Sequence, residues 1–174
     1  MLMLALGMED PAEGTVEVEF VGPGGADAAV EAIAAADLAP GTFAYVPQGN
    51  MLMSGTVRDA VTLADRSEER DSALDESLYA ACALEFVDAL PQGADTPLGE
   101  HGSGLSEGQM QRLAVARAVY SGAPVLLLDE CTSALDETTE HEMLDRLRAL
   151  GRTVIIVTHR PAALSICDRA ISLG

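Results

Sequence analysis

Two adjacent carboxylates, Asp129 and Glu130, follow the uninterrupted apolar segment at residues 125–128. Such a segment is typical of a strand that is buried on both faces of a parallel sheet, and ligands of open α/β sheets bind outside the carboxyl ends of the strands. There the first acid can hold Mg²⁺, and the second can orient or deprotonate an attacking water molecule. Acids after buried strands also cap the following turn, and the pair alone does not separate these two interpretations.

Gln48 and His159 are expected at the same sheet edge. Gln48 follows a predicted short strand at residues 43–47, and His159 follows a predicted buried strand at residues 153–158. An amide at a strand end can contact a metal ion or a water molecule, and the imidazole would face the same ligand site. An isolated histidine is more often structural, so the prediction for His159 depends on its position.

A capped helix start is predicted at Ser106. Ser106 and Gln109 have the spacing of a capping box, in which a glutamine follows the N-cap serine by three residues. The first turn of a helix presents free N–H groups and the positive end of the helix dipole, which suits a phosphate. Gly108 is expected to let a ligand approach the backbone closely. On these residues alone, an ordinary capping box is the stronger interpretation.

The rest of the pattern predicts an α/β domain. A strand is predicted at residues 15–20, an alanine-rich helix at 26–38, and a further strand that begins at residue 170. Further helices are predicted at residues 56–65, 74–90, 106–120 and 136–150, the last of them amphipathic with an apolar stripe at residues 143, 144, 147 and 150. Strands that alternate with helices at the C-terminal end favour a layered α/β arrangement. A helical subdomain at residues 51–120 is expected within an α/β core made of residues 1–50 and 121–174.

The composition is that of an acidic chain with ample material for a core. Hydrophobic residues make up 48% of the 174 residues, and the net charge is −18. Such a charge disfavours binding to nucleic acid and to anionic membrane surfaces. The 3 cysteines are odd in number and widely spaced, which does not suit a disulfide framework. No apolar run approaches the roughly 20 residues that span a bilayer.

Taken in order, the motifs resemble the nucleotide-binding domain of ABC transporters. The sequence holds Gln48, then LSEGQ at residues 105–109, VLLLDE at 125–130, SALD at 133–136, and His159. The resemblance extends over about residues 9–173. It implies a P-loop NTPase-like ABC ATPase core, a mostly parallel sheet with flanking helices, an inserted helical subdomain, and ATP with Mg²⁺ as cofactors.

The resemblance implies a role for each residue at the sheet edge. Asp129 would lie near Mg²⁺, and Gln48 would sense the same ion and couple the site to a membrane domain. Glu130 would be the general base, and His159 would contact the γ-phosphate of ATP.

The resemblance also implies a second nucleotide-binding domain, paired head to tail. The signature, which touches the γ-phosphate held by the partner, would consist of Leu105, Ser106, Glu107, Gly108 and Gln109. Asp136 would end the D-loop, residues 133–136, at the dimer interface. Glu107 stands where the commonest signature has glycine, and it adds a negative charge close to a phosphate site.

Two loop segments resemble exporters in particular. They are residues 47–58 and residues 90–102. In exporters the second stretch lies beside the coupling helices of the membrane subunit. The resemblance therefore implies a transmembrane domain as a partner and a peripheral position on the cytoplasmic face of the plasma membrane.

The sequence departs from the family at the P-loop. The pattern G-x-x-x-x-G-K-S/T needs a lysine, and all 10 basic residues of this chain are arginine. Residues 22–25 are rich in glycine but lead to Asp27, whose carboxylate would repel phosphate. Residues 10–16 resemble the stretch after the P-loop helix, and residues 1–6 resemble the tail of that helix. The chain is therefore expected to be incomplete at both ends.

Two alternatives remain. A chromosome-maintenance or DNA-repair ATPase would share the signature and the acidic pair, but here the interval before the signature is short and has no sustained heptads. The other alternative is a non-catalytic remnant, or a partner subunit that contributes only the signature half of a composite ATP site. The missing P-loop favours this second alternative.

Overall fold

A computed structural model describes residues 6–20, 31–49, 52–64, 71–99 and 104–172 of the chain. The chain divides into two compact units, Met1–Phe43 and Ala44–Gly174. The second unit holds every described residue that the sequence analysis assigned to a site. The predicted helix tail at residues 1–6 lies almost wholly outside the described residues.

The first unit contains a two-stranded antiparallel sheet. Strands β1 (Glu17–Phe20) and β2 (Glu31–Ala34) pair with Val18 opposite Ile33, and a short 3-10 helix, η2 (Ala35–Asp37), follows. The helix predicted at residues 26–38 is therefore wrong where the chain is described, and residues 26–30 lie outside that part. Cross-strand pairing of apolar side chains here outweighs the intrinsic helix preference of alanine, which is a weak prior.

A three-stranded sheet forms the centre of the second unit. Its order is β3 (Phe43–Val46), β6 (Val125–Asp129) and β7 (Thr153–Val157). Strands β6 and β7 are parallel, with Asp129 opposite Val157. The apolar residues of β6 are all buried, as predicted, whereas β7 is only partly buried and Ile155 is 39% exposed.

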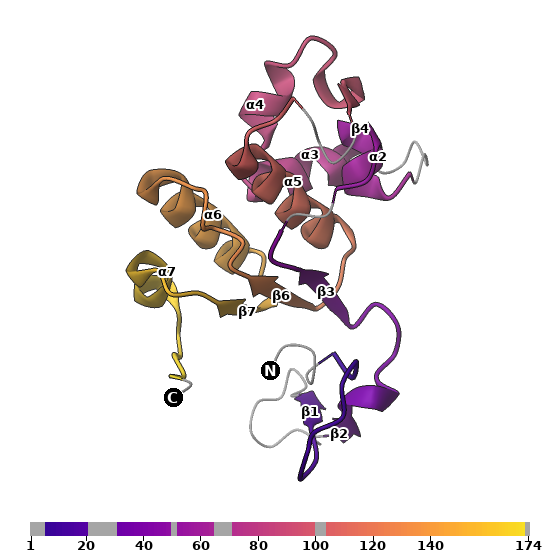
Figure 1. Cartoon of the computed structure of the whole chain (residues 1–174), viewed down its shortest axis with the longest axis vertical. Helices are drawn as coiled ribbons and strands as arrows, with labels where there is room; N and C mark the ends of the chain where they lie inside the picture. The colour runs from indigo at the N-terminus through magenta and orange to yellow at the C-terminus, as the bar shows by residue number, and fades with distance from the viewer. Residues whose placement is uncertain (1–5, 21–30, 50–51, 65–70, 100–103, 173–174) are drawn as a thin grey trace. The chain divides into compact units, whose positions relative to one another are not determined.

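A group of helices lies between β3 and β6 in the chain (Figure 1). They are α2 (Val57–Thr62), α3 (Asp71–Ala80), α4 (Leu84–Asp88) and α5 (Glu107–Tyr120). Helices α2 and α3 both pack against α5. A two-residue ladder between β4 (Gly55–Thr56) and β5 (Pro97–Leu98) and the short 3-10 helix η4 (Gly93–Asp95) complete this region. The exact bounds of the predicted helical subdomain, residues 51–120, stay a prediction.

The single helix predicted at residues 74–90 is wrong, because the chain forms two. Between α3 and α4, Cys82 has a φ of 53°, in the left-handed region. The backbone N–H of Ala83 donates to the carbonyl of Leu78 over 2.7 Å, which closes the end of α3. A left-handed residue commonly ends a helix, but apolar periodicity cannot reveal it when that residue is not glycine.

Two helices follow the central strands. Asp136 is the N-cap of α6 (Glu137–Ala149), whose buried side is formed mainly by Met143, Leu144 and Leu147, in line with the predicted amphipathic stripe. Helix α7 (Pro161–Ile166) packs against α6. The strand predicted from residue 170 does not form over residues 170–172. The structure confirms an α/β fold with a parallel strand pair and helices beside it.

Candidate functional site

The carboxyl ends of β3, β6 and β7 bring the predicted polar residues together. Gln48 follows β3, and its Nε2 donates a hydrogen bond to Glu130 Oε2 over 3.1 Å. His159 follows β7, and its Nδ1 lies 3.5 Å from Glu130 Oε1. The two oxygens of one carboxylate therefore face an amide on one side and an imidazole on the other, as the strand-end argument predicted.

The backbone of Glu130 directs the chain away from the sheet. Its φ is 49°, which is uncommon for a residue that is not glycine. The N–H of Glu130 donates to Val157 O over 2.9 Å, and its carbonyl accepts from Ser133 N at 3.2 Å. A strained conformation of this kind persists where its surroundings fix it. The Glu130 side chain is 30% exposed and that of His159 is 74% exposed, so both remain accessible from solvent.

Asp129 has a neighbour that the sequence reasoning missed. The hydroxyl of Tyr45, on β3, donates to Asp129 Oδ2 over 3.3 Å. Burial raises the pKa of Tyr45 above its ordinary value, and the negative charge of Asp129 and this hydrogen bond raise it further. The signal in the sequence is the place of Tyr45 on the strand that Gln48 follows, three residues before it. Tyr45 therefore stays a neutral donor that orients Asp129.

The helix start at Ser106 has the predicted capping box. Gln109 N donates to Ser106 Oγ over 3.2 Å, and Ser106 N donates to Gln109 Oε1 over 2.9 Å. Ser106 and Glu107 are exposed, while Leu105 is half-buried against the core. A serine hydroxyl that accepts one hydrogen bond still has its proton to donate, so the cap leaves Ser106 able to donate to an anion.

Gly108 packs closely against the segment that follows Glu130. A Cβ atom built on Gly108 would lie 2.8 Å from the backbone oxygen of Ala134 and 3.3 Å from a Leu135 methyl carbon. The space that the missing side chain leaves is thus occupied by the chain itself. The contact of Gly108 with a ligand stays a prediction.

Gln111 is a second residue that the sequence reasoning missed. It is buried on α5; its Nε2 donates to Ser133 Oγ over 2.7 Å, and its Oε1 accepts from Ala134 N at 3.0 Å. Both hydrogen-bonding groups of the amide are therefore used to join α5 to the segment after Glu130. A buried glutamine on an otherwise apolar helix face was the available signal.

Asp136 lies at the start of α6. Its Oδ1 accepts from Thr139 N at 3.0 Å and its Oδ2 accepts from Thr139 Oγ1 at 2.7 Å. These hydrogen bonds, the backbone one first, lower the pKa of Asp136 below its ordinary value. The structure shows a helix cap here, and the contact of Asp136 with nucleotide stays a prediction.

In the part of the chain that the structure describes, no helix is long and apolar enough to cross a membrane.

Comparisons with known proteins agree with the geometry. The family model described as ABC transporter matches residues 1–133. An ATP-dependent lipid A-core flippase of Cupriavidus pinatubonensis is 44% identical over 135 residues, which are 75% of this chain and 23% of that protein. The flippase of the same name from Bordetella pertussis is 39% identical over 160 residues, or 88% of this chain and 26% of that protein.

A solved structure has the same fold. It is described as a bacterial Atm1-family ABC exporter with ATP bound, and it matches with a TM-score of 0.66 and 36% identity over 74% of this chain and 22% of that one. The chain spans about a quarter of the length of the curated relatives it matches. Because the family model covers most of its residues, the chain belongs to the ABC transporter family and has the fold of that family's ATPase domains.

Proposed function

We propose that this chain acts as an ATP-hydrolysing domain that powers an exporter. Membership of the family makes it an ABC-type ATPase at the family level, and domains of this family bind ATP. At the level of residues, we propose that hydrolysis takes place at the sheet edge that carries Gln48, Asp129, Glu130 and His159. The proposal also assigns the signature and the 133–136 segment to ATP that is held by a second nucleotide-binding domain.

The observation that carries the proposal is the environment of the Glu130 carboxylate. Its two oxygens lie 3.1 Å from the Gln48 amide nitrogen and 3.5 Å from His159 Nδ1. An ionised carboxylate accepts only, so it can take a proton from a water molecule placed between it and a phosphate. The amide fixes its orientation, and the accessible imidazole can donate to a phosphate oxygen.

The donor set at the same edge suits Mg²⁺. Asp129 offers a carboxylate oriented by Tyr45, and Gln48 offers a neutral amide oxygen once its nitrogen faces Glu130. Mg²⁺ in phosphoryl-transfer sites takes one or two carboxylates, and substrate phosphates and water supply its other ligands. When bound, the ion would neutralise charge on the phosphates.

The signature supports a head-to-tail partner. The hydroxyl of Ser106 can still donate a hydrogen bond to an anion. The first turn of α5, beside it, presents backbone N–H groups that have no partner within the helix. The 174 residues contain no lysine, so the lysine that the family uses on ATP is not supplied by them. This observation favours the second candidate function, a chain that contributes only the signature half of a composite ATP site.

A transmembrane domain is the second proposed partner. The two exporter-like segments meet in the structure, because Gly55 and Thr56 pair with Leu98 and Pro97. The ion pair of Arg58 Nε with Asp95 Oδ1, at 3.0 Å, also joins them. The relatives are named flippases, and one exporter structure shares the fold. We propose that this joined surface docks on cytoplasmic loops of a membrane domain, which would place the chain at the cytoplasmic face.

Glu130→Gln tests the assignment of the general base. The variant is made in a P-loop-containing version, in which a segment with G-x-x-x-x-G-K-S/T precedes this sequence. Loss of a positioned base should slow ATP turnover by roughly 10²–10⁴-fold, while ATP binding, measured by equilibrium dialysis, stays intact. Glu76→Gln, at an exposed position on α3, is the matched control. Full turnover by Glu130→Gln would contradict the role.

A further inference from the structure

Arg160 connects the strand end that carries His159 to the segment that follows Glu130. Its Nη1 donates to Thr132 O at 2.8 Å, to Leu135 O at 2.8 Å and to Ser133 O at 3.3 Å. One guanidinium nitrogen thus gathers three carbonyl groups of one turn, which is called here the 132–135 turn. These carbonyls converge on Arg160 from a segment 25 to 28 residues away in sequence.

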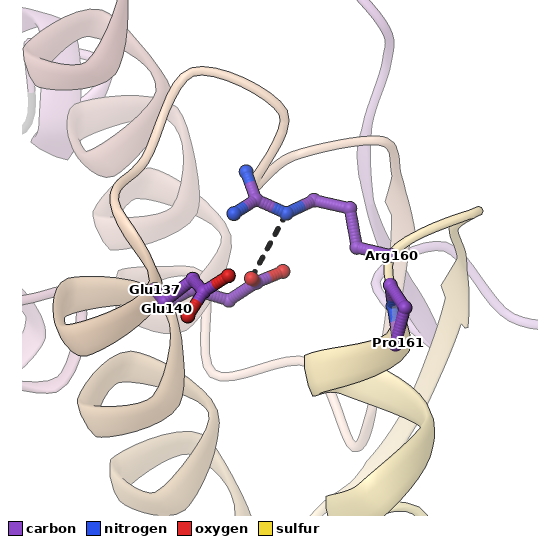
Figure 2. Close-up of a pocket in the computed structure, with 4 residues that line it drawn as sticks. All are labelled: Glu137, Glu140, Arg160 and Pro161. Carbon is purple, nitrogen blue, oxygen red and sulfur yellow. Dashed lines mark ion pairs between the residues drawn. The ribbon is translucent and has the colours of Figure 1, made fainter.

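The same guanidinium holds a buried charge. Arg160 Nε lies 2.9 Å from Glu140 Oε2, and the Glu140 side chain, on α6, is 0% exposed (Figure 2). The other carboxylate oxygen of Glu140 accepts from Thr132 Oγ1 at 2.7 Å. Glu137 and Pro161 complete the walls of a cavity of about 340 Å³ at this pair. Glu140 therefore binds both the 132–135 turn and the arginine that holds it.

The opposite side of the turn is held by the signature helix. Gln111 binds Ser133 Oγ and Ala134 N, and Gly108 leaves room for the oxygen of Ala134. The turn is consequently fixed between α5 on one side and Arg160 with Glu140 on the other. All of these contacts join residues of one chain.

We propose that Arg160 is a positioning residue that holds the 132–135 turn against the signature helix. The consequence for a partner's ATP rests on the proposed function, whereas the positioning itself does not. Removal of one member of a buried ion pair leaves an uncompensated charge, here on Glu140. Lysine cannot replace the arginine fully, because an ammonium group is a compact point charge without the planar fork.

Cys131 provides a reporter in the unmodified chain. It immediately precedes the turn and is 2% exposed, so the surrounding side chains cover its thiol. The native thiol should therefore react with a maleimide only when the turn opens. In Arg160→Met, opening should become frequent enough to raise the labelling rate of Cys131 by at least about tenfold. Peptide mass spectrometry separates Cys131 from Cys82 and from the exposed Cys167.

The controls separate local positioning from general stability. Arg152→Met removes an arginine that binds one carbonyl, Val119 O at 2.8 Å, at the opposite end of β7. That variant should leave the Cys131 rate within about twofold of the original chain. Glu140→Gln should also raise the labelling rate of Cys131. The labelling rate in Arg160→Lys should lie between the rates in Arg160→Met and the original chain. Equal labelling rates of Cys131 in Arg160→Met and Arg152→Met would overturn the proposal. An equal increase in the labelling rates of Cys82 and Cys131 in Arg160→Met would also overturn it.

A second measurement links the turn to activity. The partner is the P-loop-containing version with Ser106→Ala, and this chain in excess should restore its ATP turnover. With the Arg160→Met chain, the kcat of the mixture should be at least about tenfold lower than with the original chain. The KM for ATP should be similar, because the partner's own P-loop binds the nucleotide. Equal restoration would overturn the proposal. Failure of the original chain to restore turnover, with the labelling result as expected, would instead contradict the proposed function alone.

Discussion

At the scale of single residues, the acidic pair separates into two environments. Glu130 faces an amide and an imidazole, while Asp129 accepts from Tyr45. The separation follows from the end of β6, where the left-handed φ of Glu130 turns the chain immediately after Asp129. Two neighbouring carboxylates can thus perform different tasks, one at a metal ion and one at a water molecule.

Tyr45→Phe tests the orientation of Asp129. Partners of metal-ligating carboxylates typically contribute about 10- to 100-fold to metal affinity or activity. The hydrogen bond at 3.3 Å is long, so we expect the lower end of that range. In the P-loop-containing version, the Mg²⁺ concentration for half-maximal hydrolysis should rise by about tenfold.

Tyr79→Phe is the control for that substitution. Tyr79 lies on α3, is 54% exposed, and contacts Arg146 through its ring. Removing its hydroxyl should leave the Mg²⁺ dependence unchanged. Identical Mg²⁺ titrations for Tyr45→Phe and Tyr79→Phe would show that the tyrosine on β3 does not orient the metal ligand.

At the scale of elements, the sequence was most informative where one periodicity ran without interruption. The apolar run of β6, the capping box of α5 and the stripe of α6 all have the predicted structure. Strand ends also placed Gln48, Glu130 and His159 together correctly, because the carboxyl ends of neighbouring parallel strands share an edge.

The errors occur where tertiary contacts override local preference. Residues 31–34 pair with β1 although alanine favours a helix, and Cys82 adopts a left-handed conformation that no pattern of apolar residues reveals. The long-range side-chain bonds of Tyr45, Gln111 and Arg160 were likewise missed. Each of these hydrogen bonds joins residues that are at least 22 positions apart, so the spacing of residues in the sequence does not identify the partner.

Gly108→Ala tests how α5 meets the 132–135 turn. Alanine should favour the helix by about 1 kcal/mol over glycine, but its methyl group would contact Ala134 O at 2.8 Å. Overpacking of this kind costs about 1–3 kcal/mol. We therefore expect a net loss of stability of up to about 2 kcal/mol, measured by urea unfolding.

Glu107→Ala provides the comparison at the neighbouring exposed position of the same helix. It removes a favourable charge at the helix N-terminus, which contributes about 0.3–1 kcal/mol. A Gly108→Ala chain that is more stable than the original would mean that the 132–135 turn can shift without a loss of stability. The glycine would then have a role other than close packing.

At the scale of the whole molecule, the proposed function divides the described features into two halves of a reaction centre. One half comprises Gln48, Asp129, Glu130 and His159 at the sheet edge, and the other comprises the signature with the 132–135 turn. In the proposed head-to-tail arrangement, these halves serve different ATP molecules. The net charge of −18 further disfavours nucleic acid as a partner.

This arrangement predicts different behaviour for the chain alone and in a complex. Phosphoryl-transfer catalysis depends mainly on positioning and charge stabilisation, and the family's phosphate-binding lysine is missing from these 174 residues. The chain alone should therefore bind ATP only weakly beside Asp129, Glu130 and His159. In the proposed head-to-tail arrangement, its signature would need no lysine of its own, since it would act on ATP that the partner holds.

The most direct test is the Mg²⁺-dependent ATP turnover of the purified chain, alone and with the Ser106→Ala partner defined above. We predict negligible turnover for the chain alone. In the mixture, turnover should exceed that of the partner alone by at least about tenfold, since a single positioned donor to a transition state is often worth 10²–10³ in rate. Robust hydrolysis by the chain without a partner would contradict this account, because it would require a phosphate-binding site other than the one the family uses.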